Sequence, residues 1–209
     1  SVTQERLQEL LDMENVVHTY QILHEKLYCG RSMLTQAQVA SLYLLSLDRD
    51  ADGCLVELGA YAGASTVCIA QAAKELGESM VSIDTFKGTG CSKLDTRDTK
   101  EIYLQGLSRS LVLNNVITLQ GFFSDIVNYW ARPIRFLFID GSHDYDSVKE
   151  DFEKWSPFVS ERGLVLFHDW NPSFPGVVQF CRSLKGHPEW VAVAVIDTSI
   201  LFWRSKNET

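Results

Sequence analysis

The sequence predicts an α/β fold on a mostly parallel sheet, with an antiparallel hairpin at its C-terminal end and helices on both faces. Up to about residue 184, short apolar segments alternate with segments of helical periodicity, a pattern typical of parallel strands joined by right-handed crossovers. Only a few residues separate the last two apolar segments, which favours an antiparallel pairing for them. The seven expected strands are 54–56, 80–83, 116–119, 134–139, 164–167, 190–196 and 200–203.

The composition indicates one globular domain with a sizeable core. The chain has 209 residues, of which 45% are hydrophobic and 22% charged. Its net charge of -8 argues against nucleic acid as a partner, because a phosphate backbone is bound through a basic surface. The 5 cysteines are odd in number and lack C-x-x-C spacing, so we expect buried thiols in a reducing compartment. With no signal-peptide pattern and no long apolar run, we expect a cytoplasmic protein without a membrane partner.

Residues 1–50 are expected to form a helical extension before the first strand. Apolar residues recur at helical spacing from Gln4 to about Leu27, which predicts one amphipathic helix ended by Gly30. A second helix is predicted from Thr35, its N-cap, to Leu47. This extension could be a lid over the ligand edge, part of the core, or the surface of a homodimer.

The stretch VELGAYAGAS, residues 56–65, predicts a strand that turns into a helix through Gly59 and Gly63. The first N–H groups of such a helix have no partner, so the turn can cradle a polar ligand. Side chains at the glycines would block the approach of the backbone to that ligand. The patterns of dinucleotide and phosphate loops are absent. We expect Glu57 to face the mouth of the turn, where it suits a ligand with an amino or sulfonium group.

Acids also follow the later strands. Asp84 follows the second strand at the distance of one strand-helix-strand unit, where an acid can accept hydrogen bonds from both ribose hydroxyls. Asp140 follows the fourth strand and Asp169 the fifth. Because parallel strands end at one edge of a sheet, we expect Glu57 and these three acids to surround one crevice. Residues 85–100 form the longest irregular stretch, which is typical of a functional or mobile loop.

These motifs resemble those of class I S-adenosylmethionine-dependent methyltransferases. The acid-x-Gly-x-x-x-Gly pattern resembles their motif I, and residues 83–88 and 138–170 are similar to small-molecule O-methyltransferases of natural-product and macrolide-sugar pathways. The resemblance covers about 54–203. It implies a Rossmann-like methyltransferase fold, with residues 51–209 as the S-adenosylmethionine-binding domain. The cofactor-binding residues it implies are Glu57, Gly59, Ala60, Tyr61, Gly63, Ser65, Asp84, Thr85, Phe86, Phe122, Ser124, Asp125 and Asp140.

The resemblance implies methyl transfer to a hydroxyl of a small molecule, which requires a group that removes the hydroxyl proton. His143 is one candidate, because the reference pKa of histidine lies near neutrality. A Mg²⁺ ion on Asp140 and Asp169 is another, as in catechol-type relatives, although those carry Asp-Asn where this chain has Asp169-Trp170. His168 could act as a base, as a ligand or as a residue that orients Asp169.

Two other functional classes fit parts of the pattern. A non-catalytic module could keep the fold and bind the methyl donor, or a partner, without turnover. An NAD-dependent oxidoreductase could use a similar sheet, but the third glycine of its turn is missing and Glu57 would repel a pyrophosphate. No residue pattern names the methyl acceptor.

Overall fold

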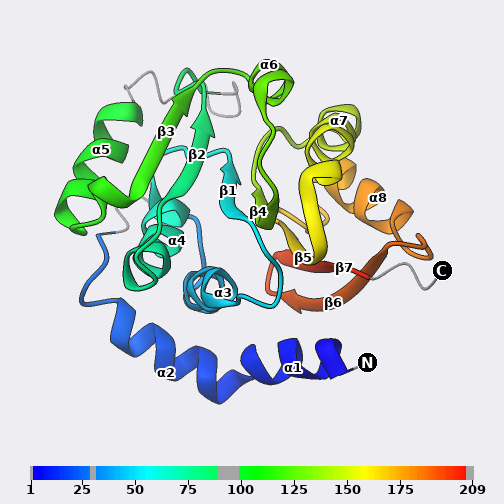
Figure 1. Ribbon diagram of the computed structural model, residues 1–209, viewed down its shortest axis with the longest axis horizontal. Helices are drawn as coiled ribbons and strands as arrows, with labels where there is room; N and C mark the ends of the chain where they lie inside the picture. Colours follow the sequence, from blue (N-terminus) through cyan, green and yellow to red (C-terminus); the bar gives the residue numbers. More distant parts are fainter. Residues whose placement is uncertain (1, 29–31, 89–98, 206–209) are drawn as a thin grey trace.

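A computed structural model describes residues 2–28, 32–88 and 99–205. Its seven-stranded sheet has the order β3-β2-β1-β4-β5-β7-β6 (Figure 1). β1 to β5 are parallel, and β7 runs antiparallel to both β5 and β6. The predicted mostly parallel sheet and its antiparallel hairpin are therefore confirmed. The strands are β1 Cys54–Leu58, β2 Met80–Asp84, β3 Val116–Gln120, β4 Ile134–Ile139, β5 Val159–Phe167, β6 Trp190–Ile196 and β7 Ser199–Arg204.

Helices cover both faces of the sheet, and each face has its own apolar core (Figure 1). Alternate residues of one strand enter different cores: Phe136 packs with α3, α4 and α5, whereas Leu137 packs with α7 and α8. Burial on both faces explains why β1 and β4 are apolar apart from one residue each, Glu57 in β1 and Arg135 in β4. The helices are α1 Val2–Leu10, α2 Met13–Leu23, α3 Gln36–Leu47, α4 Ala64–Glu75, α5 Thr99–Arg109, α6 Phe123–Ile126, α7 Tyr145–Trp155 and α8 Pro175–Ser183. Short 3-10 turns are η1 Leu113–Asn115, η2 Val127–Tyr129 and η3 Ser156–Phe158.

The first part of the N-terminal extension differs from the single helix predicted from Gln4 to about Leu27. It forms two helices, α1 and α2, because Asp12 caps the second one by accepting a hydrogen bond from the Asn15 N–H at 2.9 Å. α2 ends at Leu23, before the expected end near Leu27, and Gly30 lies outside the described residues. α3 begins after its predicted N-cap, Thr35. The side chains of Thr35 and Gln38 each accept a hydrogen bond from the backbone N–H of the other residue, which is a capping box.

α1, α2 and α3 belong to the core on the α4 side of the sheet. Leu7, Leu23 and Leu45 are fully or almost fully buried there. Figure 1 shows α1 and α2 running along one side of the molecule next to α3. The extension therefore supports the sheet, and a role as a lid or a dimer surface remains a prediction.

Three further expectations concern the irregular stretch, the cysteines and membrane spans. Of the irregular stretch 85–100, residues 89–98 lie outside the described part and α5 begins at Thr99. The described cysteines, Cys54, Cys68 and Cys181, are buried thiols, as expected. Among the described residues, no helix combines the length and apolarity that crossing a bilayer requires.

Candidate functional site

The glycine turn after β1 is tied to the end of β2 by Asp84. One oxygen of its carboxylate accepts hydrogen bonds from the N–H groups of Ala60 and Tyr61, at 2.8 and 2.9 Å. The other oxygen accepts from the Phe86 N–H at 2.7 Å. Asp84 therefore fixes the shape of the turn, and the oxygen that accepts from Phe86 still has lone-pair capacity for a ligand hydroxyl.

Glu57 does not face the mouth of the turn, so that expectation is wrong. Its side chain is fully buried and accepts hydrogen bonds from the hydroxyls of Ser65, Thr66 and Ser82. Burial raises the pKa of Glu57 to about 7, against the three hydroxyls that lower it. Glu57 thus joins β1, β2 and the first turn of α4. Of the four predicted acids, Asp84, Asp140 and Asp169 lie at the ends of their strands with partly exposed side chains.

The glycines of the turn are required by neighbouring protein atoms. Gly59 has a φ of +97°, and a Cβ there would lie 2.0 Å from the carbonyl oxygen of Asp140. Gly63 caps α4 with a φ of +91°, and its Cβ would lie 3.1 Å from the ring of Tyr103. The close approach that we expected for a ligand is therefore made by β4 and α5. Tyr61, between the glycines, also has a positive φ of +47°.

The turn after β3 lies beside Asp84, because the Gly121 N–H donates to the Asp84 carbonyl at 3.0 Å. Phe122 is 64% exposed and precedes α6, which contains Ser124 and Asp125. Phe122 is the N-cap residue of α6 and makes no side-chain capping bond, whereas Asp125 lies in the first turn of the helix.

The remaining cofactor candidates lie after β2. Thr85 accepts a hydrogen bond from the Lys87 N–H through its hydroxyl, and Phe86 is buried with a φ of +57°. The ring of Phe86 packs against that of Tyr103 at 4.9 Å between centroids. The structure thus places the turns after β1, β2 and β3 next to one another.

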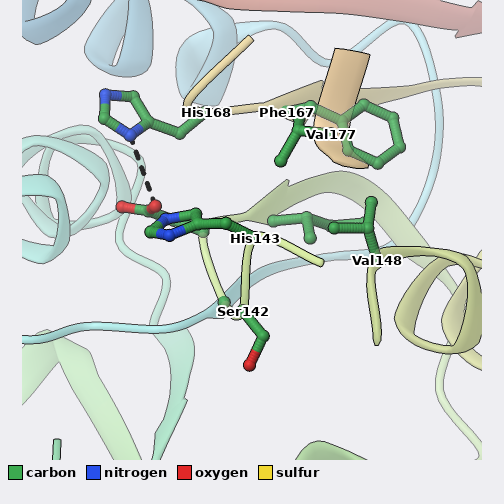
Figure 2. A pocket seen from close by; sticks show the side chains of 9 residues that line it. Ser142, His143, Val148, Phe167, His168 and Val177 are labelled. Carbon is green, nitrogen blue, oxygen red and sulfur yellow. Dashed lines mark ion pairs between the residues drawn. The ribbon is translucent and has the colours of Figure 1, made fainter. Parts of the chain in front are cut away.

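A second group of candidates gathers at the ends of β4 and β5. His143 Nε2 lies 2.7 Å from Asp169 Oδ2. His168 Nδ1 lies 3.2 Å from Asp169 Oδ1 and 3.3 Å from Asp140 Oδ1, and the latter pair is dashed in Figure 2. These distances fit ion pairs, although neither ring nitrogen of His168 is aligned for a hydrogen bond. Asp169 therefore lies between the two histidines.

The charges of this group depend on one another. Burial lowers the pKa of His168, but the two neighbouring acids outweigh it and raise that pKa to about 10. Asp169 is affected in the opposite sense: burial raises its pKa, but His143 and His168 hold it well below the usual range. Burial raises the pKa of Asp140, against His168. The two acids thus favour the protonated form of His168, which fits the orienting role, and His143 stays the candidate base.

A small cavity lies beside this group. Figure 2 shows His143 and His168 on one side of it and Val148, Phe167 and Val177 on the other. The ring of His143 also packs against Phe174, at 4.0 Å between centroids. The cavity measures about 10 Å³, which is room for about one water molecule, so it places an apolar wall beside the polar pair without enclosing an organic ligand.

One cluster of the described residues has the ligand types for a metal ion. Asp140, His143 and Asp169 each offer one ligand atom, and these atoms lie within 4.8 Å of one another. The sequence pointed to the two acids but not to His143 as a ligand. It also missed Thr66 and Ser82, whose only signal is their polarity in otherwise apolar segments.

A model of a methyltransferase domain family matches residues 56–170, which include both groups of candidates. The chain belongs to this methyltransferase family. Another relative, the uncharacterized protein y4gI of Sinorhizobium fredii, is 32% identical over 119 residues, which are 55% of this chain. The match covers only 13% of the length of that relative.

Solved structures of methyltransferases share the fold. One is the O-methyltransferase from Bacillus cereus in complex with S-adenosylhomocysteine, with 16% identity and a TM-score of 0.63 over 95% of this chain and 91% of that one. Another is TomG from Streptomyces achromogenes with S-adenosylmethionine, with 17% identity and a TM-score of 0.63 over 93% and 91%. A third, CalS11, is a TDP-rhamnose 3'-O-methyltransferase of calicheamicin biosynthesis, with 19% identity and a TM-score of 0.60 over 97% and 92%. The predicted methyltransferase fold is therefore confirmed.

Proposed function

We propose that the chain is an S-adenosylmethionine-dependent methyltransferase that transfers the methyl group to a hydroxyl of a small molecule. The observation that carries this proposal is the His143–Asp169 pair at 2.7 Å, at the same sheet edge as the glycine turn. Methyl transfer from a sulfonium is an in-line displacement, so the protein must align the two reactants and take up one proton. The solved neighbours named O-methyltransferases support a hydroxyl as the acceptor.

The donor would lie across the turns after β1, β2 and β3. Asp84 presents a half-buried carboxylate there for the ribose hydroxyls, next to the N–H groups that it already holds. Phe122 offers an exposed ring for the adenine, with Ser124 and Asp125 nearby in α6. Glu57 contributes from below, by holding the first turn of α4.

His143 is the base in this proposal. A carboxylate at hydrogen-bond distance orients an imidazole and stabilises the imidazolium that forms when the ring takes a proton. Asp169 is placed for this task, and the neighbouring His143 and His168 lower its pKa, which favours its carboxylate form. A positioned base of this kind contributes about 10²–10⁴-fold in rate.

A divalent metal is the alternative means of activating the hydroxyl. Two ligands of one Mg²⁺ ion lie at most about 4.2 Å apart, from bonds of about 2.1 Å. The donor atoms of Asp140, His143 and Asp169 lie within 4.8 Å, so the set fits after a shift of a few tenths of an ångström. When bound, such an ion would lower the pKa of the acceptor hydroxyl.

The test combines donor binding with turnover. We expect S-adenosylhomocysteine, and not NAD, to raise the melting temperature, because a ligand of the folded state stabilises it by about 2.7 kcal/mol at 100 times its Kd. Transfer of labelled methyl from S-adenosylmethionine is then measured on a panel of small-molecule hydroxyl acceptors. Binding without transfer to any acceptor would favour the non-catalytic module, and absence of binding would overturn the proposal.

Two perturbations separate the base from the metal. The substitution His143→Gln should leave the affinity for S-adenosylhomocysteine within about twofold and lower turnover by about 10²-fold or more. Chelation by EDTA, followed by added Mg²⁺, should leave turnover unchanged if His143 alone removes the proton. Loss with EDTA and recovery with Mg²⁺ would instead establish the metal. A cytoplasmic location and a homodimer remain predictions from the sequence.

A further inference from the structure

Gln38 connects the N-terminal extension to the hairpin of the sheet. It lies in the first turn of α3 and is 3% exposed. Its side-chain oxygen accepts from the Thr35 N–H at 3.0 Å, so its amide nitrogen must face the turn between β6 and β7. That nitrogen lies 3.3 Å from the Ile196 carbonyl, 2.9 Å from the Thr198 hydroxyl and 3.1 Å from the Ser199 hydroxyl. Gln38 is thus a buried amide with both ends bound.

The β6–β7 turn in turn holds the segment after β5. The Thr198 carbonyl accepts a hydrogen bond from the Trp170 N–H at 2.9 Å. Trp170 directly follows Asp169, so this bond fixes the peptide group on the C-terminal side of Asp169. A second bond from α3 reaches the same turn, because the Thr35 hydroxyl donates to the carboxylate of Asp197. The contacts run without a gap from α3 to Asp169.

Asp169 depends on such support because of its backbone. Its φ is +59°, in the left-handed region that residues with a Cβ rarely adopt. Conformations of this kind persist where surrounding contacts hold them. In this conformation, the two oxygens of Asp169 reach His143 and His168. A displacement of the Trp170 N–H from the β6–β7 turn would shift the adjoining Cα of Asp169, and both contacts of its side chain would shift with it.

We propose that Gln38 is a positioning residue for the methyl-transfer site. By holding the β6–β7 turn it fixes the Trp170 peptide, and so keeps Asp169 where it orients His143. The effect of Gln38 on methyl transfer rests on the proposed function. Its effect on the position of the Trp170 peptide does not. It gives α3 a task beyond packing, because the extension then supports the residues at the end of β5.

The test compares Gln38→Leu with Gln71→Leu. Both remove a buried glutamine amide at similar volume, but the amide of Gln71 donates at 2.9 Å to Glu75 on its own helix and does not reach the hairpin. Amide exchange at Trp170 and the ring ¹⁵N shifts of His143 are measured by NMR at one fixed pH. Exchange is expressed relative to the Ile83 amide in β2, which removes any general loss of stability.

In Gln38→Leu we expect exchange at Trp170 to rise at least tenfold relative to Ile83, with displaced ring signals of His143. In Gln71→Leu the relative exchange at Trp170 should stay within threefold of the wild type, and the ring signals of His143 should not shift. If Gln38→Leu does not fold, Thr198→Val removes one of the same bonds and should raise the relative exchange more than threefold. Unchanged exchange and unchanged His143 signals in the folded variant would overturn the proposal.

Activity and donor binding separate this inference from the proposed function. Gln38→Leu should lower kcat at least tenfold on an acceptor that the wild type methylates, and leave the Kd for S-adenosylhomocysteine within threefold. A wild-type chain that does not bind S-adenosylhomocysteine refutes the proposed function but leaves the exchange result valid. Intact donor binding with no change at Trp170 or His143 refutes the role of Gln38 alone.

Discussion

The substitution Gly59→Ala adds only one methyl group but should strongly destabilise the protein. The added methyl group would lie 2.0 Å from the carbonyl oxygen of Asp140 and 2.7 Å from its carbon, and both atoms belong to the backbone. A flexible side chain could move aside, but a backbone carbonyl at the end of β4 cannot. The turn after β1 and the end of β4 would have to separate. This movement would stretch the hydrogen bond that the Asp140 N–H donates to the Leu58 carbonyl at 2.8 Å.

Two terms give the size of the effect. A residue with a Cβ in the left-handed region costs about 1–2 kcal/mol. Overpacking by one methyl group in a tightly packed place costs about 1–3 kcal/mol more. The sum for Gly59→Ala is about 2–5 kcal/mol, a large part of a typical total stability of about 5–15 kcal/mol.

Gly77→Ala is the matched control. Gly77 also has a positive φ, +68°, but nothing lies within 4 Å of its added Cβ, so only the backbone term of about 1–2 kcal/mol applies. Denaturant unfolding measures the free energy of both variants. Gly59→Ala should be less stable than Gly77→Ala by about 1–3 kcal/mol, a difference of about 2–12 °C in melting temperature for a chain of this size. Equal losses would show that the contact between Gly59 and Asp140 does not determine this residue.

Three further substitutions test the site and its supports. Because the pKa of Glu57 is raised to about 7 from 4.5 by burial, the folded state binds this proton more tightly than the unfolded state. The free energy of unfolding should therefore fall as pH rises from about 4.5 to 7, and Glu57→Gln should flatten that fall in denaturant titrations at several pH values. Asp84→Ala should weaken binding of S-adenosylhomocysteine at least tenfold by calorimetry, because the ribose contact and the shape of the turn are both lost; equal affinity would reject the assignment. Arg135 is 4% exposed, donates to three carbonyl groups and pairs with the carboxylate of Glu78. Arg135→Met should therefore lower the free energy of unfolding by about 3–5 kcal/mol. Arg162→Met, which removes an exposed pair with Asp50, should lower it by less than about 1 kcal/mol.

The sheet was predictable because its signals are local. Each parallel strand contains a short, mostly apolar segment, and the acids at the ends of β2, β4 and β5 mark where these segments end. The first residues of β5, 159–163, are largely polar and were not expected to belong to a strand. Topology then places Asp84, Asp140 and Asp169 at one edge without any tertiary information. The break between α1 and α2 was also within reach, since Asp12 is a good N-cap residue, but the apolar periodicity continues across it.

The direction of Glu57 was not predictable, for a physical reason. In a strand buried on both faces, apolar residues occupy both sides, so the pattern does not say which side a single polar residue takes. The partners that decide it, Thr66 and Ser82, come from α4 and β2 and meet Glu57 only in the folded chain. The link through Gln38 joins residues about 160 positions apart and leaves no local signal either.

These contacts change how the acids would serve a positively charged donor. The sequence suggested several bare carboxylates around one crevice, and such a group would repel itself strongly in a partly buried place. Instead each acid has a protein partner: hydroxyl groups for Glu57, backbone N–H groups for Asp84, and His168 for Asp140 and Asp169. These donors offset part of the cost of burying the acids before any ligand arrives. Besides the ribose contact proposed for Asp84, these acids would hold the turns and His143 in place, so that the donor meets a surface that is already shaped.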